Sequence, residues 1–232
     1  MTVPRVLRRI PRPLALCAAF FCLASPLAAE PLSGQLRLVE DGKARTEYEG
    51  VVIYFTPESP MPVEPLEEPA EITTVRKQFL PRVVAVTPGS KVRFPNQDPI
   101  LHNVFSVSGR NRFDLGFYKS DDEGKDAVFN YPGVVRVFCN VHHEMVAYVV
   151  VVETPFITSP EADGRFELTD LPAGPGTLTI WHERAEPMDV PVTLPLARPL
   201  ELDVELTRPR VPKHTNKFGK PYSRRKRGKA YN

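Results

Sequence analysis

The sequence predicts an all-β protein made of two β-sandwiches, and three observations support this fold class. Short runs rich in β-branched and aromatic residues recur along the chain, separated by turn residues. The chain has 26 prolines and 13 glycines, a composition that favours short strands and turns over long helices. The strand pattern restarts after residue 154, which indicates a second, smaller β-unit.

The first 29 residues are predicted to be a cleaved signal peptide. Four arginines precede an apolar run at residues 14–23, and Ala28 and Ala29 offer a small-residue cleavage site. The apolar run is short for a membrane span and ends before Pro26, so cleavage is favoured over an uncleaved anchor. We therefore expect an exported, periplasmic protein whose mature chain keeps one cysteine, Cys139.

The next two segments are predicted to be a strand pair followed by a linker. Residues 30–56 contain a partly alternating run, a turn at residues 40–43, and a β-branched and aromatic run at residues 51–55. Residues 57–70 are rich in proline and glutamate and show no periodicity, so they are predicted to be a linker without regular structure.

Residues 71–153 contain a series of short predicted strands with the spacing of an all-β sandwich. The strands are predicted at residues 72–76, 82–87, 91–94, 102–107, 127–131, 134–139 and 145–153. The last of these is rich in valine and is long enough to be central in a sheet. Residues 154–207 then repeat the pattern, with a hairpin signal at Asp163 and Gly164 and four further strands.

The charge of the chain is unevenly distributed. Residues 30–207 hold all 28 acidic residues against 16 lysines and arginines, whereas residues 208–232 hold ten lysines and arginines and no acid. We expect residues 208–232 to be a disordered basic tail. The tail could contact anionic membrane surfaces or an acidic protein, or it could act only as a solubilising segment. Nucleic acid is not an expected partner of an exported protein.

The candidate functional residues are Cys139, His142 and Met145, which lie between two predicted strands, together with His102 at the start of another strand. A lone cysteine is usually a buried apolar residue. Here a thiolate, an imidazole and a thioether fall within seven residues, and a distant histidine completes the ligand set of a blue-copper site. The sequence therefore predicts one copper ion per chain.

Two neighbouring residues complicate this assignment. His143 could compete with His142 as a ligand, contact an electron-transfer partner beside the site, or be a solvated side chain. Glu144 could supply an oxygen ligand in an unusual copper centre. His182 could suggest a second metal site, but no cysteine or methionine accompanies it in its Trp-His-Glu segment, so we expect a structural role for it.

The ligand segments also show a family resemblance, which covers residues 72–153. Two segments resemble the amicyanin and plastocyanin branch of the cupredoxins. One is segment 129–145, which contains the Cys-x-x-His-x-x-Met pattern. The other is segment 94–104, in which Phe-x-Asn-x-Asp precedes a His-Asn pair. The resemblance implies a Greek-key β-sandwich and assigns four ligands and one supporting residue. The equatorial ligands would be His102, Cys139 and His142, the axial ligand would be Met145, and Asn103 would join the His102 loop to the Cys139 loop.

The polar pair formed by His143 and Glu144 departs from the less polar residues that this branch often has, which leaves the polarity around the metal open. More loosely, the whole exported chain resembles proteins labelled methylamine-utilisation proteins. Segments 34–55 and 163–174 resemble a carboxypeptidase regulatory-like, transthyretin-like β-sandwich, a module that is usually a scaffold or a binding surface. We therefore expect residues 30–56 and 154–207 to form one discontinuous sandwich, with the copper domain at residues 71–153 inserted into it.

The function that these observations favour is that of a periplasmic type 1 copper protein, which carries single electrons to or from a redox partner protein and is not an enzyme. A multicopper oxidase would need more histidine clusters than the five histidines can supply. Copper storage or delivery is an alternative, although such proteins usually expose methionine-rich or cysteine-rich sites. A binding module without redox activity is the other alternative.

Overall fold

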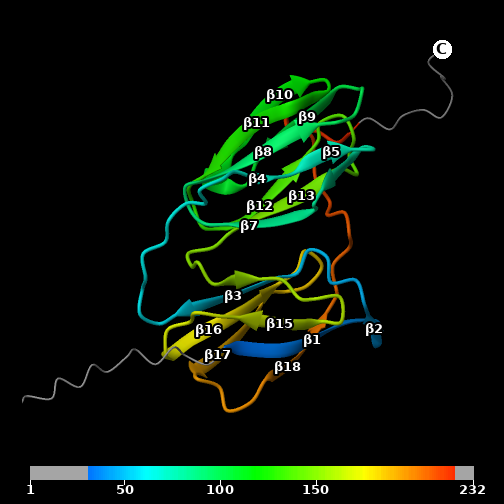
Figure 1. Ribbon diagram of the computed structural model, residues 1–232. Helices are drawn as coiled ribbons and strands as arrows, with labels where there is room; N and C mark the ends of the chain where they lie inside the picture. Colours follow the sequence, from blue (N-terminus) through cyan, green and yellow to red (C-terminus); the bar gives the residue numbers. More distant parts are fainter. Residues whose placement is uncertain (1–30, 223–232) are drawn as a thin grey trace, which may run out of the picture.

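A computed structural model describes residues 31–222, and it confirms that the protein is all-β. Apart from one short 3₁₀ turn, η1 (Gly109–Asn111), every regular element in this range is a strand. Figure 1 shows two layered β-units, one above the other. Within the described residues, no helix has the length and apolar character needed to cross a bilayer. The predicted signal peptide, residues 1–29, lies outside the described residues.

The lower unit in Figure 1 consists of two four-stranded sheets. One sheet has the order β15 (Arg165–Leu168), β1 (Leu32–Glu40) and β18 (Leu200–Glu205), with β2 (Lys43–Arg45) also paired to β1. The other has the order β14 (Ile157–Thr158), β3 (Val52–Pro57), β16 (Gly174–Trp181) and β17 (Met188–Leu194).

In each sheet of this unit, a strand from before residue 58 is hydrogen-bonded to strands from after residue 156. In the first sheet, β1 pairs in parallel with β18 and antiparallel with β15. In the second, β3 pairs antiparallel with β14 and β16. The hairpin at residues 163–164 allows a close approach, because a Cβ atom on Gly164 (φ +87°) would lie 2.3 Å from the carbonyl oxygen of Leu36. Glycine is therefore required at that turn.

The upper unit is a sandwich of two five-stranded sheets. One sheet has the order β10 (Phe113–Tyr118), β9 (His102–Ser106), β12 (Gly133–Phe138), β13 (Val146–Val151) and β7 (Val83–Val86). The other has the order β11 (Asp121–Phe129), β8 (Ser90–Asn96), β5 (Thr73–Val75) and β6 (Gln78–Leu80), with β4 (Ala70–Glu71) also paired to β8. Residues 58–69 join the two units and contain no strand.

Alternation of side chains along the strands decides which residues face the core of the upper unit. On β12, Val135 and Val137 point into the space between the two sheets, and Cys139, just past the strand end, continues the same face. Phe138 points the other way and belongs to a separate apolar cluster outside the sandwich. On β9, Val104 faces the core and Phe105 faces the outer cluster.

That outer cluster joins the two units. The outer face of the sheet that contains β12 and β13 packs against β3 and β16 of the lower unit, and Tyr148 and Trp181 meet there with ring centroids 5.5 Å apart. Arg82 and Glu183 form an ion pair beside them at 2.7 Å, with both side chains largely removed from solvent. The apolar cluster makes this a firm junction, because separation would expose its side chains to water.

The basic tail requires a correction. Residues 208–222, expected to be disordered, continue from β18 of the lower unit and pack along the upper one. The backbone amides of Thr207 and Arg208 both donate to the carbonyl of Arg184 at 2.9 Å, and His214 stacks on Phe138. The composition of this segment predicted disorder. The structure instead packs the ring of His214 against the outer face of the upper sheet, at Phe138. Residues 223–232 lie outside the described residues.

Candidate metal centre

The predicted ligands come from two neighbouring strands of one sheet. Strand β9 begins at His102, and β12 ends at Phe138, directly before Cys139. The two strands are hydrogen-bonded neighbours, with Phe138 opposite Phe105. His102 shares a face with Val104, which points into the core, as does Cys139. The strand alternation therefore directs both side chains into the same end of the sandwich.

The loop between β12 and β13 is closed by its own backbone. The amide of Cys139 donates to the carbonyl of Met145 at 3.3 Å, and the amide of Met145 donates to the carbonyl of His142 at 3.0 Å. These bonds form a tight turn at residues 142–145 and close the hairpin at its end. The turn returns the chain toward Cys139 and brings the side chain of His142 back over the thiol.

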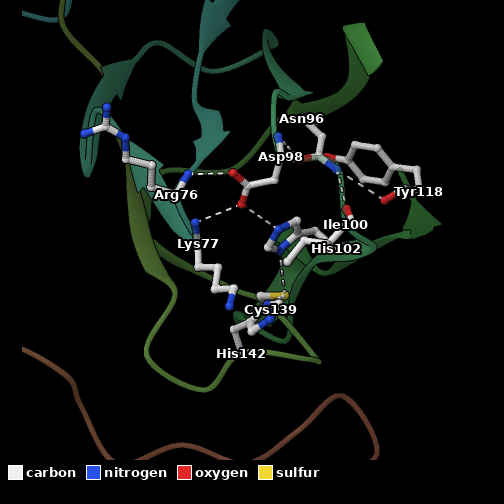
Figure 2. A network of polar contacts seen from close by, with 9 residues as sticks. All are labelled: Arg76, Lys77, Asn96, Asp98, Ile100, His102, Tyr118, Cys139 and His142. Atoms are coloured by element: carbon white, nitrogen blue, oxygen red, sulfur yellow. Dashed lines mark hydrogen bonds and ion pairs between the residues drawn. The ribbon is translucent and has the colours of Figure 1, made fainter. Parts of the chain in front are cut away.

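Three candidate ligand atoms converge in the structure. The Sγ atom of Cys139 lies 3.7 Å from Nδ1 of His102 and 3.8 Å from Nδ1 of His142. All three donors lie within 4.8 Å of one another. Figure 2 shows the imidazole of His102 directed at the sulfur of Cys139. The imidazole rings themselves are 4.7 Å apart at their centroids.

These spacings fit a shared metal ion. A first-row ion binds thiolate sulfur at about 2.3 Å and imidazole nitrogen at about 2.0–2.1 Å. With the donors spread trigonally, at about 120°, those bond lengths place sulfur and nitrogen about 3.8 Å apart. The observed separations agree with this value, and a thiolate with two imidazoles is the donor set that favours copper.

The fourth predicted ligand, Met145, lies in the same buried cluster as Cys139. Its side chain is almost completely buried, and its backbone pairs with both Cys139 and His142. A thioether is a soft donor that suits Cu(I). Met145 is therefore placed beside the three converging donors, in the apolar interior of the sandwich.

The site is shielded from solvent on one side only. His102 and Cys139 have no exposed surface, whereas His142 is half-buried. Burial lowers the pKa of His102 below its ordinary value, although the hydrogen bond and charge of Asp98 oppose this effect. His102 is therefore neutral at pH 7, as a metal ligand must be.

Asp98 is a site residue that sequence reasoning missed. Its Oδ2 accepts a hydrogen bond from Nε2 of His102 at 2.8 Å, which leaves Nδ1 of that ring facing Cys139. The backbone amides of Arg76 and Lys77 also donate to this carboxylate, at 2.6 and 2.8 Å (Figure 2). Burial alone would raise the pKa of Asp98, but the bonds from Lys77, Arg76 and His102 outweigh burial and lower it.

A second residue holds Asp98 in turn. Oδ1 of Asn96 accepts from the amide of Asp98 at 3.0 Å, and Nδ2 of Asn96 donates to the carbonyls of Ile100 and Tyr118. The loop before His102 is thus tied to β10 (Figure 2). The Asn-x-Asp spacing four residues before a histidine was the available sequence signal. Outer partners of this kind fix the tautomer and orientation of a ligating imidazole.

We expect Asp98→Asn to raise the reduction potential of the copper-loaded protein. The carboxylate beside His102 stabilises Cu(II) more than Cu(I), and loss of an outer partner typically costs about 10–100-fold in metal affinity. Each tenfold loss of Cu(II) affinity relative to Cu(I) corresponds to about 59 mV. Voltammetry measures the potential.

Asp126→Asn is the matched control. Asp126 on β11 is also a carboxylate with a hydrogen-bonded partner, Arg93 on β8, but it does not contact His102. A lower or unchanged potential in Asp98→Asn would contradict the assignment.

The two polar neighbours of His142 are directed outward. The side chain of His143 is 65% exposed and that of Glu144 is 80% exposed, and Nε2 of His143 lies 3.7 Å from Oε1 of Glu144. Neither belongs to the group of converging donors among the described residues. His182 lies at the junction of the units, where its Nδ1 accepts from the amide of Arg184 at 3.3 Å. Burial, with Arg184 and Arg82, lowers the pKa of His182 to about 4, so it is a neutral structural residue.

Asn103 has partners other than those expected. Its Nδ2 donates to Asp114 and to the carbonyl of Gly116, both at 2.8 Å and both on β10. Its side chain was expected to join the His102 loop to the Cys139 loop, but both of these hydrogen bonds go to β10 instead. Adjacent residues on a strand point to opposite faces, so Asn103 points away from the face that His102 occupies. The link to the Cys139 loop is indirect and runs through Asp114 and Lys217 to Asn140.

Comparisons with known proteins find similar solved structures. No protein-family model matches the chain, and no curated protein matches it significantly. A purple cupredoxin from Nitrosopumilus maritimus is 23% identical, with a TM-score of 0.32, over 36% of this chain and 99% of that one. Amicyanin from Paracoccus versutus is 21% identical, with a TM-score of 0.33, over 43% of this chain and 97% of that one.

A copper-containing nitrite reductase from Thermus scotoductus is 21% identical, with a TM-score of 0.35. The match covers 50% of this chain and 28% of the reductase, so the chain spans about a quarter of that protein's length.

Proposed function

We propose that residues 71–153 form a cupredoxin-type copper domain and that the protein is a type 1 copper protein that carries one electron at a time. The observation that carries this proposal is the convergence of the buried Cys139 thiol with His102 and His142, at 3.7 and 3.8 Å. A thiolate with two imidazoles and a nearby thioether is the donor set of blue-copper electron carriers. One copper ion is expected per chain.

When bound, copper supplies a one-electron Cu(I)/Cu(II) couple. The protein residues hold the donors in one arrangement through that change. His102 is fixed by Asp98, Cys139 by its strand, and Met145 by the backbone bonds that close the loop. Because His102 begins a strand and Cys139 and Met145 directly flank strands in a packed core, little rearrangement accompanies a change of charge, and fast electron exchange requires this.

The burial of the donors supports an electron carrier over a copper store or delivery protein. A protein that passes metal to a partner needs ligands that the partner can reach. Here Cys139 and His102 are fully buried, and only His142 is half-buried. An electron, in contrast to a metal ion, can leave through the edge of one partly exposed ligand.

We further propose that the protein is exported to the periplasm. The proposal rests on the signal-like residues 1–29 and on the single cysteine that remains after them. The lower sandwich then serves as a scaffold, because the sheet that contains β3 and β16 holds the copper domain through the apolar junction around Trp181.

The absorption spectrum of the copper-loaded mature chain tests the function. We expect one equivalent of copper and an intense visible band toward the red, which arises from charge transfer between the Cys139 thiolate and Cu(II). The copper-free and zinc-loaded chains are the controls, and both should be colourless. Copper bound without this band would favour storage or delivery, and failure to bind copper would favour a module without redox activity.

A further inference from the structure

Residues 208–222, which we call the C-terminal strap, run from the lower sandwich to the metal end of the upper one (Figure 1). The strap is held at its start by the carbonyl of Arg184, and Arg82 donates to the carbonyl of Arg210. From there it follows the outer face of the sheet that supplies His102 and Cys139. The strap therefore connects the scaffold to the surface beside the candidate metal centre.

At its far end the strap contacts the ligand loop directly. The ring of His214 stacks on Phe138, with centroids 4.2 Å apart and planes 11° from parallel. The backbone amide of Lys217 donates to Oδ1 of Asn140 at 3.1 Å, and the hydroxyl of Tyr222 donates to the carbonyl of Cys139 at 3.0 Å. A molecule that approaches Cys139 from this side meets the strap first.

The strap also carries an exposed aromatic pair. Phe218 is 71% exposed, and Phe117, at the end of β10, is 51% exposed. The ammonium group of Lys217 lies 5.0 Å from the centroid of the Phe117 ring and 5.5 Å from that of Phe218. Lys217 also pairs with Asp114 at 2.7 Å, so it is held in place between the rings. Two large rings exposed together at one functional end indicate a contact surface.

The charges around this pair are positive. The strap has five lysines and arginines and no acidic residue, whereas residues 30–207 are net negative. Lys217 and Arg208 are paired with carboxylates, whereas Lys213 and Lys220 are exposed and form no ion pair among the described residues. The ligand loop contributes one exposed negative charge, Glu144. An apolar centre with a charged rim is the usual composition of a protein interface.

We propose that the strap and Phe117 form the docking surface for a redox protein whose contact face has an apolar centre surrounded by carboxylates. The proposal rests on the proposed electron-carrier function. In the docked complex one electron passes between copper and the partner's redox centre, so Cu(I) becomes Cu(II) as the acceptor gains that electron, and no proton or bond changes place. Charge complementarity accelerates the encounter, and the rings provide close contact near Cys139.

Anionic lipid is the competing partner, because it is bound through clusters of about four to eight lysines and arginines. Arg210, Lys213 and Lys220 are exposed and form no ion pair among the described residues, and the sequence has five more lysines and arginines at residues 224–229. The exposed aromatic pair, in contrast, is a feature of protein contacts and is not required for lipid binding through basic residues. Transient electron-transfer complexes need only small interfaces, below about 1,200 Å² in total. The small aromatic pair and its rim match that scale.

The first experiment measures binding without copper. The copper-free mature chain is titrated with succinylated cytochrome c, an acidic protein, and with native cytochrome c, which has the same haem and a basic surface. Amide chemical shifts and calorimetry follow the binding. We expect the acidic form alone to bind, with shifts at residues 213–220, and the affinity to fall as salt rises. The double variant Lys213→Glu with Lys220→Glu and the single variant Phe218→Ser should each weaken binding about tenfold or more.

The matched control is the double variant Lys43→Glu with Arg198→Glu, which changes the net charge equally on exposed residues of the lower sandwich. An equal loss of binding in this control would show a general charge effect and overturn the proposal. Unchanged binding in the strap variants would overturn it as well. Pelleting with phosphatidylglycerol vesicles is the third arm. Vesicle binding that depends on the strap residues, without binding of the acidic cytochrome, would identify lipid as the partner instead.

The second experiment uses the copper-loaded, reduced chain and follows electron transfer to ferric succinylated cytochrome c by stopped flow. The strap variants should slow the second-order rate about tenfold while the reduction potential stays constant. A rate unaffected by the strap variants would overturn the proposal. If the chain binds no copper but still binds the acidic cytochrome at the strap, the electron-carrier function fails and the docking surface stands.

Discussion

Cys139→Ser is expected to abolish the visible charge-transfer band of the copper-loaded protein completely. The thiolate is the source of that band, and a serine hydroxyl neither forms a thiolate nor binds Cu(I) well. Cys139 is the only cysteine in the described residues, so no other thiol there can replace it. Removal of a residue that supports a ligand typically lowers metal affinity about 10–100-fold. Loss of this ligand should cost more, and the absorption spectrum and a copper titration measure both effects.

The control for this variant is the stability of the copper-free fold. Cys139 is fully buried in the apolar core, and an unpaired buried hydroxyl costs about 1–3 kcal/mol. Urea unfolding should show a cooperative transition with a free energy of unfolding reduced by about that amount. Loss of colour in a folded variant then reports on the metal centre. A Cys139→Ser protein that stays blue would refute the copper-thiolate assignment, whatever the fold.

His142→Ala is expected to lose the band or weaken copper binding drastically, whereas His143→Ala should keep both. Nδ1 of His142 lies 3.8 Å from the thiol sulfur, but the imidazole of His143 is 65% exposed and lies beside Glu144. The two variants remove the same side chain from adjacent positions, so each controls for the other. Copper titration and absorption spectra give the comparison. The opposite result, loss of copper in His143→Ala alone, would overturn the ligand assignment.

The partial exposure of His142 allows a sharper version of this test. His142→Gly should regain colour when imidazole is added, because an external ligand can reach a position that is half-buried. His102→Gly should regain little, because His102 is completely enclosed and its position is bordered by Asp98. Equal recovery of the two variants would contradict the solvent access that the structure shows.

The fold class followed from the sequence because short β-branched runs and turn residues are local signals. The run at residues 145–153 predicted a central strand, and β13 (Val146–Val151) is buried along its whole length. The spacing of Cys139, His142 and Met145 was equally local, since one hairpin loop holds all three. Their partner His102 lies 37 residues away, and its pairing became visible only through the neighbouring strands β9 and β12.

The residues that support the centre could not be predicted in the same way. Asp98 is one acid among 28, and its role depends on a loop that folds back so that Nε2 of His102 reaches it. Asn103 was predicted from its position in a motif, but strand alternation directs its side chain toward β10. Hydrogen-bond partners of this kind depend on the angles between chain segments, and those angles cannot be predicted from composition or residue spacing.

The sequence by itself determined the all-β class, the candidate donor set and the unequal distribution of charge, because each depends on residue type and local spacing. Only the tertiary structure decided the path of residues 208–222. Their composition is that of a disordered segment. Yet Phe138 points out of the sandwich, and the ring of His214 stacks on it and covers it from water. The free energy gained by this stacking depends on an apolar face that strands distant in the sequence build together. The composition of residues 208–222 therefore could not predict that this basic segment is ordered beside the metal loop.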